Sequence, residues 1–306
     1  MRPASIGDWF ADGFPIPVGD WADAALDWFK DVFEWLLDFV ALVIGFLVDG
    51  LGDGLLAVPF GVLIVVFALV GWLVRSWQLA LGTVITLLLV YSMGQWENAM
   101  LTLALVLVAA VIAILIAIPL GILAARNDAF SAAIKPVLDF MQTMPSFVYL
   151  IPAVLFFGIG FVPGVFATVL FSLAPGVRFT ELGIRGVDSE TVEAGQAFGA
   201  TPGRILRGIQ LPLATPTIMA GINQVIMLAL SMAVVAGMAG ADGLGKEVVQ
   251  AINTLNISQG VEAGLSVVIV AVFLDRVTAA LGNPAEYKSS LIGTLKKRRG
   301  AARAAA

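Results

Sequence analysis

The sequence contains, at residues 188–212, the stretch DSETVEAGQAFGATPGRILRGIQLP, which lies between two long apolar segments. Its local chemistry predicts two short helices separated by a break. Asp188 or Ser189 can cap the first helix, and Gly199 can adopt the left-handed conformation that ends it. Thr201 can cap the second helix, with Pro202 at the first helical position, where the missing proline N–H costs nothing. We therefore expect a rigid elbow.

The composition around this elbow is that of a membrane protein. The chain has 306 residues, of which 59% are hydrophobic and 13% charged, and its mean hydropathy is +0.97. Soluble domains are about 45–50% apolar and about 25% charged. Helices and closed barrels are the structures that span a bilayer, and the long apolar runs predict an all-α, polytopic helix bundle.

Seven apolar runs approach the length of about 20 residues that a transmembrane helix needs, and the charged residues in them, such as Asp139, Arg178 and Asp275, lie at or near their ends. The runs are Leu55–Val74, Trp77–Met93, Ala99–Ala124, Val137–Phe161, Pro163–Thr180, Pro216–Ala239 and Val261–Ala280. The fourth run is interrupted by Pro145 and Pro152. We expect about seven spans in a membrane domain over residues 55–282, with the elbow in a loop at 181–215.

The loop charges predict an orientation. If every second connection faces the same side, that side receives the basic residues Arg75, Arg126, Lys135, Arg185, Arg204 and Arg207, together with the basic tail at 283–306. Basic loops face the cytoplasm. The N-terminus and the loop 240–260 are therefore expected outside, and the C-terminus inside.

The N-terminal section, residues 1–54, is acidic and contains an amphipathic segment at 20–39. Trp21, Trp28 and Trp35 recur every seventh residue, away from a face of acidic side chains. We expect a helix that lies in the membrane interface. A soluble amphipathic helix is the alternative, and whether residues 35–50 cross the membrane is left open.

Several kinds of chemistry are excluded. The sequence contains no cysteine and no histidine, which removes disulfides, thiol or imidazole catalysis and the common zinc sites. We expect no catalytic residue and no metal site. Residues 240–247, GADGLGKE, nearly match a phosphate-binding loop, but Glu247 stands where a hydroxyl must bind magnesium, and an apolar run precedes them. We expect no nucleotide to bind there.

A family resemblance rests on the elbow. Glu193-Ala194, Gly199 and Leu211-Pro212 resemble the "EAA" loop of ATP-binding-cassette (ABC) importer permeases. The resemblance implies a helix bundle of the type I importer kind, in which this loop docks into a separate ATPase subunit. That subunit would bind ATP and magnesium, so this chain would be no enzyme and would need no cofactor of its own.

Other segments resemble one subfamily of these permeases. Residues 210–224, 144–152, 228–232 and 274–276 are similar to permeases for glycine betaine and proline betaine. This implies uptake of a quaternary ammonium osmoprotectant through a bacterial inner membrane. A second copy of the chain and an external or periplasmic substrate-binding protein are the further expected partners. Choline, carnitine or an amino acid remain alternative substrates.

Some polar or helix-breaking residues within the apolar runs are candidates for the translocation pathway. They are Met144, Pro145, Ser146, Asn223, Gln224 and Ser231. Polar groups inside a membrane usually face the bundle interior or a water-filled path. Hydrogen bonding between helices is the alternative explanation.

Two other classes of function were weighed. A secondary transporter driven by an ion gradient is favoured by carboxylates within the spans and by an inverted repeat. The middle of each predicted span lacks carboxylates, and no repeat is visible. An intramembrane enzyme needs a catalytic set that the sequence lacks. The importer permease is therefore the preferred interpretation.

Overall fold

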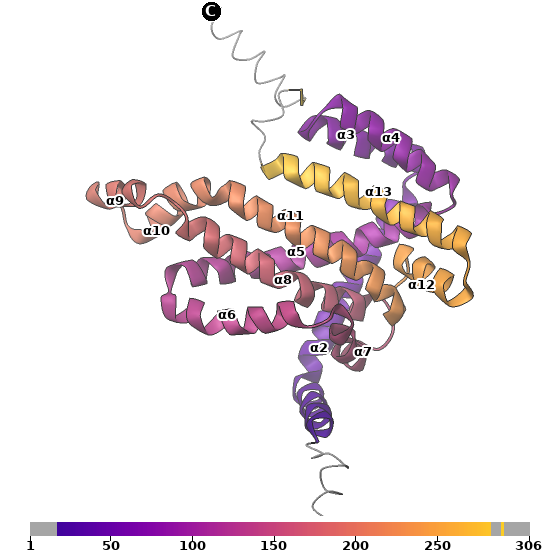
Figure 1. Ribbon diagram of the computed structural model, residues 1–306, viewed down its shortest axis with the longest axis horizontal. Helices are drawn as coiled ribbons and strands as arrows, with labels where there is room; N and C mark the ends of the chain where they lie inside the picture. Colours follow the sequence, from indigo (N-terminus) through magenta and orange to yellow (C-terminus); the bar gives the residue numbers. More distant parts are fainter. Residues whose placement is uncertain (1–16, 283–288, 291–306) are drawn as a thin grey trace, which may run out of the picture. The chain divides into compact units, whose positions relative to one another are not determined.

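A computed structural model describes residues 17–282 and 289–290, and every element assigned in these ranges is a helix (Figure 1). The all-α fold is confirmed. The chain divides into two compact units, residues 1–42 and residues 43–306. The start of the acidic section and most of the expected basic tail fall outside the described residues.

The described part of the first unit is the N-terminal portion of α2 (Val18–Ala57). The backbone leaves helical geometry at Phe33, with φ −109° and ψ 18°. The rings of Trp28 and Phe29 both lie against Phe33, with centroid distances of 6.4 and 4.7 Å. The helix expected over residues 20–39 is present, and its position in a membrane interface stays a prediction.

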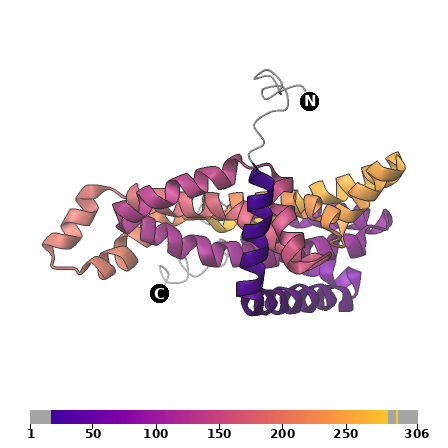
Figure 2. The same cartoon turned by 90° about the horizontal axis from the view of Figure 1, so that it is seen from below.

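Three long helices form the core of the second unit: α5 (Trp96–Arg126), α8 (Phe161–Arg185) and α11 (Leu211–Ala236). They lie side by side in Figures 1 and 2. Small residues let the backbones approach closely, because a Cβ at Gly176 of α8 would lie only 2.7 Å from the Ala117 Cβ of α5. Close packing of small residues is a main source of helix association in membranes.

The structure has fewer full-length spans than the seven apolar runs suggest. Among the described residues, α5, α8, α13 (Ile257–Gly282) and the continuous helix Pro202–Ala239 are long and apolar enough to cross a membrane. The number rises to six if each of two bent helix pairs counts as one span. The two bends account for two of the missing spans, because hydropathy does not register a change in chain direction. The remaining expected span, Trp77–Met93, forms a helix of only 16 residues, Trp77–Ser92.

The first bend divides the run Leu55–Val74. The chain turns by 107° between α2 and α3 (Phe60–Val74). Pro59 lies in this break, and a proline disfavours helical geometry in the residue before it. A tight connection then leads to α4 (Trp77–Ser92), capped by Ser76, whose Oγ accepts a hydrogen bond from the Leu79 N–H at 3.3 Å.

The second bend divides the run Val137–Phe161, so a single straight helix does not cover it, and whether the bent pair forms one span stays a prediction. The segment forms α6 (Asp128–Thr143), the 3-10 turn η1 (Ser146–Tyr149) and α7 (Leu150–Phe157), and the chain bends by 108° after α6. Met144 is extended, with ψ 134°, because Pro145 follows it.

The segment that nearly matches a phosphate-binding loop is a turn between helices. It follows η3 (Gly237–Ala239) and leads into α12 (Leu244–Thr254), so a helix and not a strand precedes it. The Thr102 Oγ1 of α5 accepts a hydrogen bond from the Leu244 N–H at 2.8 Å. Lys246 Nζ lies 2.6 Å from Asp242 Oδ1, and this hydrogen bond raises the pKa of Lys246. The lysine is therefore paired within its own turn.

Candidate functional site

The elbow consists of α9 (Ser189–Ala197), α10 (Pro202–Ile205) and a π-helical turn, η2 (Leu206–Gln210), that runs directly into α11. Figures 1 and 2 show it protruding from one end of the core helices. In Figure 1, α12 lies at the opposite end of these helices. The expected helix–break–helix arrangement is confirmed.

The caps of α9 hold the break in a defined geometry. The Asp188 side chain accepts a hydrogen bond from the Glu190 N–H at 3.0 Å. At the other end, Gly199 has φ +75°, and its N–H donates to the Gln196 carbonyl at 2.8 Å. The next N–H, of Ala200, donates to the Gly195 carbonyl at 3.1 Å, which completes a Schellman motif. The left-handed conformation predicted for Gly199 is confirmed.

Both ends of the expected loop 181–215 are helical. Helix α8 continues to Arg185 and α11 begins at Leu211, so the connection covers residues 186–210 instead of 181–215. Buried groups extend both helices, since Ile184 and Ala214 belong to one apolar cluster with Leu206. The Thr201 side chain makes no capping hydrogen bond, although Pro202 occupies the start of α10 as predicted.

The candidate coupling residues differ in exposure. Glu193, Ala194 and Gly199 are exposed on α9 and its C-terminal turn, as is Pro212 at the start of α11. Leu211 is half-buried and packs against the apolar cluster below the elbow. The first four therefore form an accessible surface, and Leu211 packs the elbow against the membrane helices.

Phe198 was not singled out from the sequence. Its side chain is 93% exposed at the tip of the elbow, directly before the Gly199 turn. The available signal was a lone aromatic residue in an otherwise polar and small-residue helix end. An exposed aromatic ring beside a fixed turn is the kind of group that anchors a protein interface.

The candidate pathway residues do not share one environment. Asn223 Nδ2 donates to Asp275 Oδ1 at 3.0 Å, and the Thr278 hydroxyl donates to Asn223 Oδ1, so Asn223 links α11 to α13. Gln224 and Ser231 are exposed and lie seven residues apart, on one face of α11. The alternative of helix–helix hydrogen bonding thus describes Asn223.

The other three candidates lie at the break after α6. Met144 packs against the buried cluster that contains Tyr149 and Met232, Pro145 is exposed, and Ser146 begins η1. Tyr149 donates a hydrogen bond to the Met141 carbonyl across the break. A role for these residues in the pathway stays a proposal.

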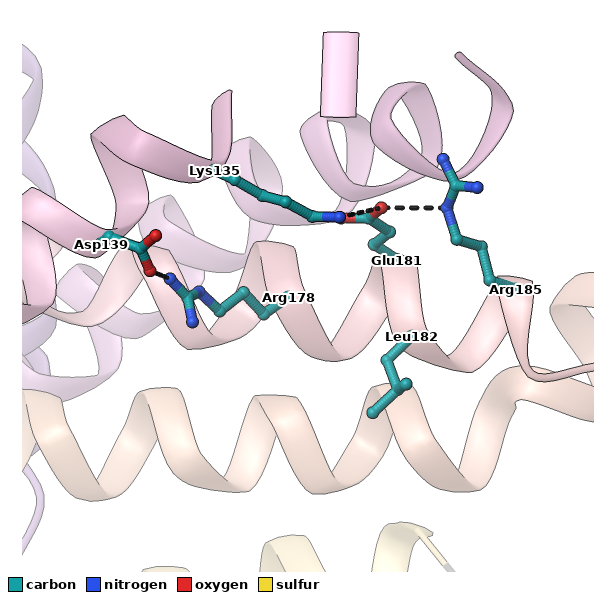
Figure 3. A pocket seen from close by; sticks show the side chains of 6 residues that line it. All are labelled: Lys135, Asp139, Arg178, Glu181, Leu182 and Arg185. Atoms are coloured by element: carbon teal, nitrogen blue, oxygen red, sulfur yellow. Dashed lines mark hydrogen bonds and ion pairs between the residues drawn. The ribbon is translucent and has the colours of Figure 1, made fainter. Parts of the chain in front are cut away.

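A charged cluster between α6 and α8 was also missed as a unit. Glu181 is buried, and its Oε1 accepts a hydrogen bond from the Ser131 hydroxyl at 2.6 Å. The same oxygen forms an ion pair with Arg185 Nε at 2.9 Å (Figure 3). Lys135 Nζ lies 3.9 Å from the same oxygen, and Arg178 pairs with Asp139. The partners line a cavity of about 450 Å3.

A signal for this cluster exists in the sequence. Charged or hydroxyl side chains recur at residues 128, 131, 135 and 139 and at 178, 181 and 185, which places each set on one face of a helix. Among the described residues, no three acidic side chains converge in a way that could hold a metal ion. The cluster is balanced in charge and clamps α6 to α8.

The sequence is similar to a known family of transport proteins. Residues 117–282 match the family described as binding-protein-dependent transport system inner membrane component. The chain belongs to this family. It is a multi-pass permease component of an ABC importer, and this confirms the interpretation drawn from the elbow.

Two curated relatives are similar to this permease along most of their length. The glycine betaine transport system permease protein OpuAB of Bacillus subtilis is 46% identical over 263 residues, or 86% of this chain and 93% of that protein. The glycine betaine/proline betaine transport system permease protein ProW of Escherichia coli is 42% identical, over 90% of this chain and 78% of that protein.

A solved structure shows the same fold. A chain of the MetNI methionine ABC transporter in an inward-facing conformation superposes with a TM-score of 0.58 at 19% identity. The match covers 62% of the permease and 95% of that chain. The permease therefore has the helix-bundle fold of this importer class.

Proposed function

We propose that this permease carries glycine betaine, proline betaine or a related quaternary ammonium osmoprotectant into the cell. The observation that carries the proposal is the 46% identity to a glycine betaine permease along 93% of that protein. Relatives at lower identity are named for other substrates: trimethylamine N-oxide at 38%, choline at 33% and carnitine at 34%. Like glycine betaine, these three substrates are small molecules with a methylated nitrogen.

The elbow is proposed as the docking site of a separate ATPase subunit, which binds ATP and magnesium. Its support is geometric, because the capped helix α9 and the Gly199 turn fix an exposed Glu193-Ala194 at the tip of a rigid projection. Through η2 the projection is continuous with α11. A movement of the docked ATPase is thus transmitted to a core helix.

The proposed orientation places the elbow in the cytoplasm and α12 outside. The Arg75 turn, the α5–α6 connection and the elbow carry the basic loop residues. The Ser289 hydroxyl, which follows α13, lies 3.5 Å from the Arg75 carbonyl, so these two basic ends meet on one side. An external binding protein then delivers substrate to the end that carries α12.

Reconstitution tests the proposed function. The permease, its ATPase and its binding protein are placed in liposomes, and uptake of labelled glycine betaine is measured with and without ATP on the ATPase side. We expect uptake only with ATP and binding protein, unchanged by ionophores that dissipate ion gradients. Uptake driven by an ion gradient without ATP would instead establish a secondary transporter. Competition by choline, carnitine and amino acids ranks the substrates.

A further inference from the structure

Three arginines line a pocket that is formed by the end of α5 and by the α10–η2 part of the elbow. Arg126 is the last residue of α5, Arg204 lies in α10 and Arg207 in η2, and together they line a pocket of about 680 Å3. The described lining contains no carboxylate. All three side chains are exposed, and none takes part in the ion pairs found among the described residues.

The arginines of α8, by contrast, have acidic partners. Arg178 and Arg185, a short distance away in sequence, are each paired with an aspartate or glutamate. An unpaired cluster of like charges repels itself and lowers the stability of the isolated chain. A cluster of this kind would be stabilised by an anionic group from outside the chain.

The local backbone shapes the pocket. The π-helical turn η2 widens the helix where Arg207 lies, and such turns occur frequently at functional sites. Arg204 and Arg207 are three residues apart, which places them on neighbouring positions of one helical face. The Thr201 side chain, which also lines the pocket, makes no capping hydrogen bond and has its hydroxyl available.

The other arm of the elbow has the opposite charge. Asp188, Glu190 and Glu193 are exposed on α9, so the Gly199 turn separates an acidic arm from a basic one. An anionic membrane surface attracts basic groups and repels acidic ones. A protein surface with a basic and an acidic patch complements both arms at once.

We propose that Arg126, Arg204 and Arg207 bind a carboxylate-bearing segment of the ATPase subunit, and so form a second anchor beside Glu193. The proposal rests on the docking role given above to the elbow. The planar guanidinium forms paired hydrogen bonds with a carboxylate, which fixes the orientation of the bound segment as well as its position.

Charge removal tests the anchor. In purified complexes, Arg204→Gln combined with Arg207→Gln is expected to weaken ATPase binding about tenfold or more, the loss expected for charged hydrogen bonds. The double variant should also respond less steeply to added salt. Arg75→Gln, which removes the same charge from another basic turn, is the matched control and should bind like wild type.

The outcomes separate the possibilities. Unchanged ATPase affinity in the double variant overturns the proposal. If uptake by the double variant no longer depends on anionic lipid while its ATPase affinity is unchanged, the pocket binds a lipid headgroup, and the proposal is overturned. Failure of the wild-type permease to bind any ATPase would refute the proposed function itself.

Cross-linking gives an independent test. Because the chain has no cysteine, Gly203→Cys introduces a single thiol at the pocket rim, where a Cβ meets no atom within 4 Å. A photo-crosslinker attached there is expected to capture an ATPase peptide rich in aspartate or glutamate. Asn253→Cys, exposed on α12 at the other end, is the control and should capture none. An intact complex without cross-links at residue 203 contradicts the proposal.

Discussion

At the scale of single residues, two neighbours at the elbow tip have different physical requirements. Gly199 needs a left-handed backbone with φ +75°, although a Cβ there would meet no other atom within 4 Å. The cost of a side chain is therefore conformational and not steric. Phe198 has an ordinary backbone but leaves 93% of its side chain exposed.

Gly199→Val is expected to strain the turn by about 1–2 kcal/mol and to change the angle between α9 and α10. The variant should reach the membrane normally but lose uptake and substrate-stimulated ATP hydrolysis. Glu193→Ala should also lose uptake and substrate-stimulated ATP hydrolysis, because it removes an exposed carboxylate that is proposed to contact the ATPase. Gly199→Asn, which tolerates the left-handed conformation, is the control. Normal uptake in both Gly199→Val and Glu193→Ala would exclude a role of these residues in coupling ATP hydrolysis to transport. Loss of either variant protein from the membrane would favour a structural role.

Phe198→Ala is expected to lower the affinity for the ATPase about tenfold, because a buried aromatic anchor commonly contributes more than 1 kcal/mol to an interface. The fold should be unaffected, since the ring is exposed in the isolated chain. Ile252→Ala, at a 67% exposed position of α12, removes comparable apolar surface from the opposite end as a control. Equal ATPase affinity of Phe198→Ala and wild type would contradict this prediction.

The residue scale also shows what sequence could predict. The Gly199 turn follows from local backbone chemistry and was predicted correctly, and of the two predicted caps, Asp188 and Ser189, the structure uses Asp188. The exposure of Phe198 depends on the absence of neighbours, which no local rule provides. The pairing of Asn223 with Asp275 joins residues 52 positions apart, and it required the packed helices.

At the scale of elements, the sequence interpretation did not predict that two apolar runs contain sharp bends. The apolar run Val137–Phe161 has the composition of a span, and the bend at Pro145 divides it into two helices. Helix α6 is instead held along α8 by the cluster around Glu181. The charges of this cluster were visible in the sequence, but their pairing depends on the bend that was missed.

Glu181→Gln is expected to destabilise the permease by about 1–3 kcal/mol, because Lys135 and Arg185 lose a buried charged acceptor. Asp139→Asn is a matched control in the same cluster, since its pair with Arg178 is substantially exposed and worth about 1 kcal/mol or less. Thermal unfolding in detergent measures both. Equal decreases of the melting temperature would show that burial of Glu181 is not decisive.

At the scale of the whole molecule, α11 presents polar side chains on an uncovered face. Gln224 and Ser231 are exposed within a helix of transmembrane length. Polar side chains in a membrane face protein or water and not lipid. A second copy related by a two-fold axis covers such a face with the same surface.

We therefore expect two permease chains with two ATPase subunits, because each ATPase needs one elbow. Native mass spectrometry of the purified complex gives the stoichiometry directly. An active complex that contains one permease chain would exclude the dimer.

The unbroken course of α11 has a mechanical consequence. The helix from Pro202 to Ala239 contains 38 residues, which corresponds to a rod of about 57 Å at the α-helical rise. One end of this rod carries the arginines of the elbow, and the other adjoins α12. A tilt of about 5° at the ATPase end would therefore displace the far end by about 5 Å, the pitch of one helical turn. If the ATPase docks at the elbow as proposed, this one helix connects the docking site directly with the end that adjoins α12.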